Sequence, residues 1–184
     1  IWQSANGVIT IAGGKLTGYR KMAEKIVDLV VEQLQKEYGL SFCKCMTKKL
    51  PISGGDLSGA RYFETFVERK TEVGMSLGLT EEQAERLTRF YGTNVEKVFD
   101  LLTTSKLPAH LYAQLQYSIL YESVVKPVDF FIRRTGYLYF DISIVECFSD
   151  LVIHEMATLL KWSDEQTIVY SKQLQLAIKA AKIH

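Results

Sequence analysis

Helical periodicity across residues 62–181 constrains the fold of this chain more than any other feature. Apolar residues there recur at three- and four-residue intervals, the spacing that places them on one face of an α-helix. Two of the segments begin with a capping box, one at Thr80 and one at Ser163, each followed three residues later by a glutamine that can satisfy a free backbone N–H. The pattern predicts a mainly helical protein.

Seven helices are expected in this part of the chain. Pro108 and Pro127 mark two of the starts, because proline is tolerated in the first turn of a helix. No internal repeat of fixed period occurs, so we expect an irregular helical bundle. The expected helices span residues 62–77, 80–90, 95–102, 107–123, 126–134, 144–161 and 163–181.

The first forty residues follow a different pattern. Residues 8–12 are a short run rich in β-branched side chains that ends at Gly13-Gly14, which predicts a strand. A single apolar stripe then predicts one helix from Thr17-Gly18 to Gly39, a residue suited to the left-handed position after a helix. We therefore expect a mainly α fold: a β-α fragment in residues 1–40, followed by an irregular helical bundle in residues 41–184. The first residues of this second part, 41–60, are expected to be irregular in structure.

The predicted strand has no neighbouring strands in the sequence. We expect the first eighteen residues to lack sheet partners and to be poorly protected from exchange, because an unpaired strand leaves backbone groups unsatisfied. The chain also begins Ile-Trp-Gln-Ser, with no basic segment of a signal peptide and no initiator methionine. We interpret the sequence as a piece of a longer protein.

The composition excludes several classes of function. The formal net charge is only +1, which gives no electrostatic reason to expect nucleic acid as a partner. No run of eighteen apolar residues is present, so we expect no helix that crosses a bilayer. A cytoplasmic protein is the expectation, and peripheral attachment to the inner face of the cell membrane is left open.

Neither the thiols nor the histidines predict a metal site. The three cysteines, Cys43, Cys45 and Cys147, lack a second Cys/His pair at zinc spacing, so we expect ordinary reduced thiols. His154-Glu155 is followed by Thr158 where a zinc protease would need a second histidine. His110 and His184 lie far from it in the sequence.

Several blocks of the sequence together resemble one family of enzymes. Residues 10–23, TIAGGKLTGYRKMA, resemble the closing FAD-contact motif of FAD-dependent glycerol-3-phosphate dehydrogenases. Residues 126–136, KPVDFFIRRTG, resemble its C-terminal helical signature. Two shorter blocks lie between them in matching order, PISGGD at residues 51–56 and LTRFYG at residues 87–92. The resemblance runs along most of the chain and identifies it with the C-terminal region of the family.

The resemblance implies a flavoenzyme that oxidises sn-glycerol 3-phosphate to dihydroxyacetone phosphate with FAD and passes electrons to a quinone. An oxidase that uses O₂ remains the alternative within the family. Residues 1–40 would be the last part of the FAD-binding domain, and residues 41–184 a helical cap domain. The implied cofactor-binding residues are Gly13, Gly14, Lys15, Leu16 and Thr17.

The chemistry of that turn is reasonable on physical grounds. Glycines let the backbone approach a planar ligand closely, because they have no Cβ. The first N–H groups of the following helix lack intrahelical acceptors and suit a negatively charged edge. The family's dinucleotide-binding fingerprint and its substrate-binding residues would lie upstream of Ile1, so we expect no catalytic residue in this chain and an inactive fragment.

Other interpretations stay open at this stage. The Gly13-Gly14 turn could serve only tight strand-to-helix packing, and the Gly54-Gly55 loop lacks the Lys-Ser/Thr pair of a phosphate loop. Arg133 and Arg134 could pair with carboxylates at a helix end or bind phosphate. The whole chain could also be a non-catalytic interaction module that packs on the catalytic body of its own protein, or that mediates dimer or membrane contact.

Overall fold

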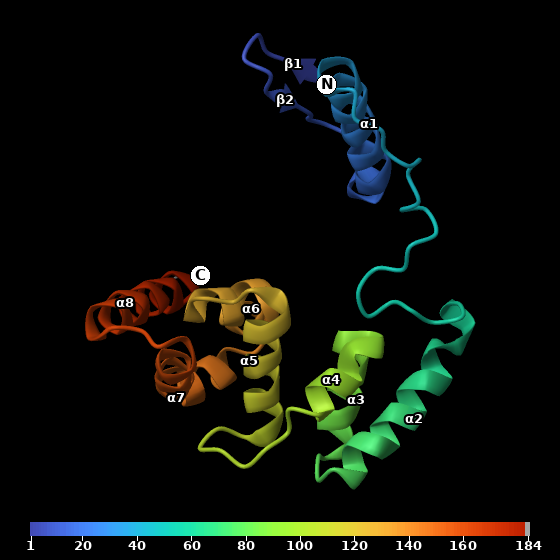
Figure 1. Cartoon of the computed structure of the whole chain (residues 1–184). Helices are drawn as coiled ribbons and strands as arrows, with labels where there is room; N and C mark the ends of the chain where they lie inside the picture. Colours follow the sequence, from blue (N-terminus) through green and yellow to red (C-terminus); the bar gives the residue numbers. More distant parts are fainter. Residues whose placement is uncertain (183–184) are drawn as a thin grey trace. The chain divides into compact units, whose positions relative to one another are not determined.

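The computed structural model of the chain describes residues 1–182 and contains two compact units (Figure 1). The N-terminal unit comprises Ile1–Ser53, and the helical unit begins at Gly54. The boundary between the two compact units therefore follows Ser53, whereas the predicted domain boundary follows Leu40. The division into domains at residue 40 stays a prediction. His184, considered above as a metal ligand, lies outside the described residues.

The N-terminal unit begins with a small hairpin. Strand β1 (Trp2–Gln3) pairs antiparallel with β2 (Ile9–Thr10), with Trp2 opposite Thr10 and Gln3 opposite Ile9. The turn between them is closed by hydrogen bonds from Gly7 N–H to the Ser4 carbonyl and from Ser4 N–H to the Val8 carbonyl, each 3.0 Å. The predicted strand is present but shorter, and the expectation that it lacks a partner is wrong, because the preceding residues fold back on it.

The long helix of this unit forms where the sequence predicts it. A single 3₁₀ turn, η1 (Leu16–Gly18), leads directly into α1 (Tyr19–Tyr38). Gly39 ends the helix in the left-handed conformation at φ +66°, and its N–H bonds the Gln35 carbonyl at 3.0 Å. Beyond it, residues 40–59 contain no helix or strand.

The helical unit confirms the mainly α fold class. Its described part contains no strand and is built from helices of very different lengths (Figure 1). In chain order they are η2 (Ala60–Tyr62), α2 (Phe63–Ser76), α3 (Glu81–Tyr91), η3 (Gly92–Asn94), α4 (Val95–Phe99), α5 (Ala109–Glu122), η4 (Asp129–Arg134), α6 (Tyr137–Phe140), α7 (Ile142–Leu160) and α8 (Asp164–Ala181).

Both predicted capping boxes are confirmed. The Thr80 hydroxyl accepts from Gln83 N–H at 3.2 Å, and the Gln83 side chain accepts from Thr80 N–H at 3.1 Å. Ser163 and Gln166 make the same pair of bonds at 3.2 and 3.0 Å. These bonds satisfy backbone donors that the first turns of α3 and α8 would otherwise leave free.

Two helical predictions need correction. Pro108 is the residue before α5 and not its first residue, with ψ near +136°. The 126–134 segment becomes a π-helix over Asp129–Arg134, closed by Thr135, whose N–H and hydroxyl both bond the Phe130 carbonyl at 3.0 and 2.7 Å. Apolar spacing does not distinguish a π-helix from an α-helix over so few residues.

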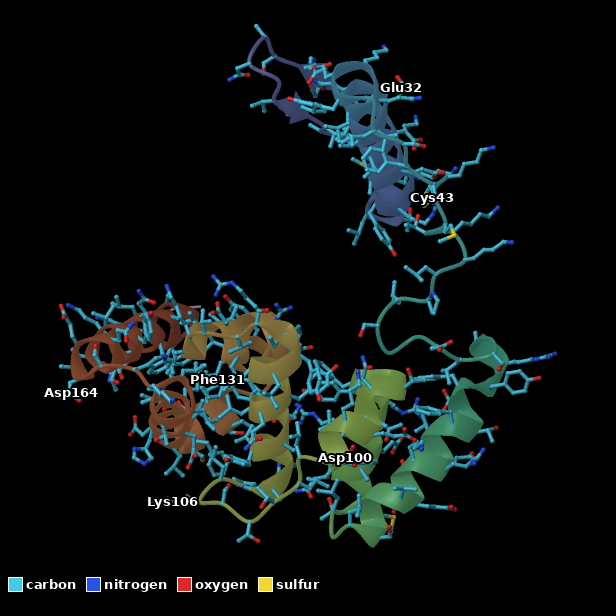
Figure 2. The ribbon with its side chains drawn as sticks, viewed as in Figure 1. Glu32, Cys43, Asp100, Lys106, Phe131 and Asp164 are labelled. Atoms are coloured by element: carbon cyan, nitrogen blue, oxygen red, sulfur yellow. The ribbon has the colours of Figure 1, made fainter. Side chains whose placement is uncertain are left out.

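The helical unit buries two apolar clusters. The first involves α3 and α4 and contains fully buried Val95 and Val98. The second is formed by α5 to α8 around Phe130 and Phe131, both 0% exposed, and Figure 2 shows Phe131 among these helices. Helix α5 contributes to both clusters, so it connects them along its length.

A buried polar chain also joins the two clusters. The Tyr137 hydroxyl donates to Gln114 Oε1 at 2.7 Å, and Gln114 Nε2 donates to the Tyr91 hydroxyl at 3.3 Å. Burial raises the pKa of both tyrosines, so they stay neutral and hydrogen-bonded over the physiological range. Tyr139, in contrast to these two tyrosines, is 65% exposed.

Candidate functional site

The predicted cofactor-contacting residues form one continuous turn between β2 and α1. Gly13 and Gly14 have φ values of +93° and +87°, a backbone conformation that side chains with a Cβ rarely adopt. A Cβ added to Gly13 would meet nothing within 4 Å, whereas one added to Gly14 would lie 3.1 Å from Met22 Sδ. Gly13 is therefore required by the backbone conformation and not by neighbouring atoms, and its surface is open to a ligand.

The turn leads into a helix start with free backbone donors. Lys15 is extended at φ −86° and ψ +151°, and no side chain caps the η1 turn that follows it. The first bonds inside this turn are donated by Gly18, to the Lys15 carbonyl at 2.8 Å, and by Tyr19, to the Leu16 carbonyl. The N–H groups of Leu16 and Thr17 precede these bonds, which is where a helix can bind a negatively charged group.

An open groove of about 710 Å³ runs from this turn along α1. Most of its lining is apolar, and Lys15 is its one charged member among the described residues. Leu16 at its mouth is 90% exposed. The lining residues are Ile11, Gly13, Gly14, Lys15, Leu16, Tyr19, Met22, Ala23, Ile26 and Val27.

The structure thus brings together four of the five predicted residues in the wall of one groove. Thr17 is adjacent in the chain but is not part of the lining. Tyr19 and Met22 line the groove and were not predicted as site residues. Their spacing from Ile26 and Val27 follows the helical period, so the apolar stripe itself is the signal that could have identified them.

Charged side chains lie on the first turns of α1. Arg20 contacts Glu24 at 3.0 Å and donates to the Thr47 hydroxyl at 3.1 Å, and Lys21 contacts Glu24 at 3.1 Å. Hydrogen bonding from Lys21, assisted by Arg20, holds the pKa of Glu24 below its usual value. The carboxylate is therefore ionised and engaged, which makes it unsuited to general acid–base chemistry at neutral pH.

The Gly54 loop has a structural explanation. A Cβ on Gly92 would lie 2.1 Å from the Gly54 carbonyl oxygen, and one on Gly54 would lie 2.5 Å from the Tyr91 carbonyl oxygen. Thr93 N–H donates to the Gly54 carbonyl at 2.9 Å. Two of the blocks that carry the family resemblance therefore meet here, and their glycines permit contact between the two backbones.

Arg133 and Arg134 are engaged at the end of the π-helix. Arg133 forms an ion pair with Asp129 at 2.5 Å, and Arg134 donates to the Glu122 carbonyl at 2.8 Å. Glu122 is the last residue of α5, so Arg134 satisfies a free carbonyl at that helix end. These contacts favour the structural interpretation of both arginines.

The described residues do not provide a metal-binding cluster. In residues 1–182, no group of three or more His, Cys, Asp or Glu side chains could hold a metal ion. His110 is partly buried, and this burial, with a smaller contribution from Arg86, lowers its pKa. None of the helices in this range has the length and hydropathy needed to cross a membrane.

The comparison with known proteins decides the family. The family of the C-terminal domain of alpha-glycerophosphate oxidase matches residues 45–167, well over half of the chain. The chain belongs to this family. The match covers the helical unit as far as the start of α8, and the Gly13-Gly14 turn lies outside it.

Curated relatives extend the similarity over the remaining residues. The aerobic glycerol-3-phosphate dehydrogenase of Staphylococcus haemolyticus is 47% identical over 98% of this chain, which spans 33% of that protein. The enzyme of the same name from Staphylococcus aureus strain USA300 is 48% identical over 99% of the chain and 34% of its own length. The chain therefore spans about a third of the curated relatives it matches.

A solved structure shows the same fold. The glycerol-3-phosphate dehydrogenase from Bacillus halodurans, complexed with FAD, superposes with a TM-score of 0.87 at 38% identity. The match covers 97% of this chain and 36% of the Bacillus chain. Both the first 44 residues, which precede the family match, and the helical unit thus have counterparts in a flavoprotein of known structure.

Proposed function

We propose that this chain is the C-terminal part of an FAD-dependent glycerol-3-phosphate dehydrogenase. The observation that carries the proposal is the 47–48% identity to aerobic glycerol-3-phosphate dehydrogenases over nearly the whole chain. The parent protein would oxidise sn-glycerol 3-phosphate to dihydroxyacetone phosphate. The chain alone would be inactive, because it spans only a third of the length of its relatives.

The turn before α1 fits one edge of a flavin. Gly13 exposes its backbone to the groove, and the N–H groups of Leu16 and Thr17 can donate to a carbonyl or an anionic nitrogen of the pyrimidine ring. The apolar wall of the groove suits the flat ring system of an aromatic ligand. We assign Gly13, Gly14, Lys15, Leu16 and Thr17 to the contact, with the dinucleotide part of FAD bound by the missing N-terminal domain.

FAD in such an enzyme supplies the hydride acceptor for oxidation of the C2 alcohol, and reduction increases negative charge along the pyrimidine edge. The role of this chain is to place donors and a cation beside that edge. Lys15 lines the groove at this point and could stabilise the added charge, by on the order of 4 kcal/mol at contact distance as an upper bound.

The main partner of the chain is the N-terminal FAD and substrate domain of the same protein. The state of α1 supports this assignment, because none of its twenty residues is buried despite the apolar stripe along it. Exposed Val27 and Val30 are 55% and 37% accessible. A helix with such a stripe packs against another apolar surface. The two thirds of the relatives' length that this chain does not span can provide that surface.

The electron acceptor is the second part of the proposal. We favour a quinone, the acceptor that the resemblance to FAD-dependent glycerol-3-phosphate dehydrogenases implies. The oxidase named by the family description is the alternative and would use O₂. A soluble quinone analogue and an oxygen electrode distinguish them: quinone reduction without peroxide supports the dehydrogenase, and stoichiometric peroxide supports the oxidase.

Activity measurements test the function itself. The FAD-loaded parent should reduce an artificial dye with sn-glycerol 3-phosphate, while the 184-residue chain with added FAD should give only background reduction. Dye reduction by the chain alone would contradict the assignment of catalysis to the missing domain. A parent that binds FAD but does not oxidise glycerol 3-phosphate would contradict the substrate.

Lys15→Met tests the role of the turn. Methionine keeps most of the side-chain stem and removes the charge. We expect a lower flavin reduction potential and a kcat reduced about tenfold, equivalent to about 1.4 kcal/mol. Lys25→Met is the matched control, since Lys25 is exposed on α1 outside the groove. Equal potentials in Lys15→Met and the parent would remove Lys15 from the site.

The second candidate function is a non-catalytic interaction module. Exposed apolar side chains on the helical unit favour it as a description of the chain alone; Phe140 is 88% exposed and Ile168 is 68% exposed. A colourless sample that gains no bound flavin on addition of FAD would support it. Dimer formation and peripheral attachment to the inner face of the membrane, in an otherwise cytoplasmic protein, are tested by light scattering and by vesicle sedimentation of the parent.

A further inference from the structure

We propose that Cys43 and Cys45 form a redox-active dithiol site that closes reversibly to an intramolecular disulfide on reaction with anionic low-molecular-weight disulfides. Both are free and exposed, although cysteine is among the residue types most often buried in proteins. A single residue, Lys44, separates them in a segment without helix or strand, and Figure 2 labels Cys43 there. The inference does not depend on the proposed function.

The backbone around the two thiols can accept a disulfide. Residues two apart have Cα atoms separated by at most about 7 Å, while disulfides form at about 4.4 to 6.8 Å. Every residue from 40 to 53 is exposed, so no packing opposes a local change of backbone conformation. A small ring of this kind is strained, and strained disulfides are readily reduced, which makes the site reversible.

The Cys45 sulfur is held by a specific contact. Its Sγ lies 3.0 Å from the Thr47 hydroxyl, which also accepts a hydrogen bond from Arg20 Nη1 at 3.1 Å. Arginine can only donate, so the Thr47 proton remains available to the sulfur. Thr47 itself lies in a turn closed by a hydrogen bond from Lys49 N–H to the Met46 carbonyl at 3.0 Å.

The charge of the segment selects the co-reactant. From residue 38 to residue 55 the chain carries Lys44, Lys48 and Lys49 and no acidic residue. Such a surface attracts anions and raises their encounter rate, and salt weakens the effect. Arg20 adds a further positive charge beside Thr47, although Glu24 neutralises part of it at 3.0 Å. An anionic disulfide is therefore favoured over a neutral or cationic one.

The reaction balances in two exchange steps. One cysteine sulfur attacks the small disulfide, forms a mixed disulfide and releases one half as a thiol. The second cysteine sulfur then attacks the protein side of that mixed disulfide and releases the other half as a thiol. The two cysteines lose two electrons and two protons, and the small disulfide gains both pairs as it becomes two thiols.

The stoichiometry of thiol release tests the pair in the 184-residue chain. The Cys147→Ser variant removes the remaining exposed cysteine, which lies on α7, and leaves only the pair. With limiting dithiobis-nitrobenzoate it should release two chromophores for each disulfide consumed and end two hydrogens lighter, with no adduct. Adding Cys43→Ser or Cys45→Ser should instead leave one stable adduct after one release. Stable adducts on both sulfurs, or disulfide-linked dimers, would overturn the proposal.

The rate comparison tests the charge selection. Replacing Lys44, Lys48 and Lys49 together by glutamine should slow the reaction with dianionic dithiobis-nitrobenzoate roughly tenfold at low salt. Cystamine, a dicationic disulfide, should react no more slowly with this variant than with the unmodified segment. An equal slowing with both reagents would overturn the selection for anionic disulfides. It would indicate that the substitutions altered the backbone conformation around the cysteines and that the lost positive charge had no effect on the rate.

Discussion

Helices α1 and α7 have almost the same length, 20 and 19 residues, and both carry an apolar stripe, yet their surroundings differ completely. Helix α7 buries Val145, Val152, Ile153 and Met156 against its neighbours, whereas α1 buries no residue. The comparison shows that an apolar stripe predicts a helix and also predicts a surface that must pack against something. In the helical unit other helices of the chain cover the stripe of α7, whereas the stripe of α1 stays uncovered in the N-terminal unit.

The glycines of the two units show the same contrast. Gly92 and Gly54 have backbone atoms directly against each other, so a Cβ would collide there. Gly13 has an equally unusual backbone and nothing within 4 Å of its Cβ position. In the helical unit, glycine makes room for the chain itself. In the N-terminal unit it leaves a surface free, which is the basis for assigning a ligand there.

The largest effect should come from truncating the helical core. Phe130→Ala should lower the free energy of unfolding by about 4 kcal/mol, because Phe130 is fully buried in the second cluster. Val27→Ala on α1 should change it by less than about 0.5 kcal/mol in the same chain, since Val27 is 55% exposed. Urea denaturation followed by circular dichroism measures both. Similar losses would mean that α1 packs as tightly as the helical core.

A smaller loss is expected from filling the glycine contact. Gly92→Ala should cost about 3 kcal/mol, because its Cβ would lie 2.1 Å from the Gly54 carbonyl oxygen and its φ is +54°. Gly39→Ala is the matched control, with φ +66° and no atom within 4 Å, and should cost about 1 kcal/mol. If both variants lose the same stability, the cost is conformational and the Gly54–Gly92 contact contributes nothing.

Much of this fold could be predicted from the sequence because its signals are local. The capping boxes at Thr80 and Ser163 and the glycine end at Gly39 depend on residues within one turn. The hairpin and the π-helix were not predicted. Strand β1 is too short to show alternation, and the apolar spacing of the π-helix, which includes buried Phe130 and Phe131, also fits an α-helix.

The candidate site was only partly predictable, for a related reason. The assignment of Gly13 to Thr17 rests on the resemblance of residues 10–23 to a flavin-contact motif, because a glycine turn before a helix can also serve only strand-to-helix packing. The groove along α1 could not be predicted, since its walls depend on how the turn folds back on Tyr19 and Met22. The contact between Gly54 and Gly92 joins residues far apart in the sequence, so no local sequence pattern predicts it.

The smallest expected effect is a pH dependence confined to the helical unit. Burial lowers the pKa of His110 below its ordinary value of 6.5, so the unfolded chain gains a proton at higher pH than the folded chain does. The unfolding free energy should therefore fall as the pH drops through 6.5 and below. His110→Gln should flatten this dependence, and His154→Gln, at an exposed position, should retain it. An unchanged slope in His110→Gln would assign the dependence to other groups.

Hydrogen exchange at the backbone of Leu16 and Thr17 tests the central claim most directly, because these two N–H groups are the proposed donors to the flavin. In the parent protein, FAD should slow their exchange at least about tenfold, which corresponds to roughly 1.4 kcal/mol of added protection. The amides of residues 108–160 should be well protected with or without FAD. Unchanged exchange at Leu16 and Thr17 in a parent protein that has bound FAD would contradict the assignment of this turn to the cofactor.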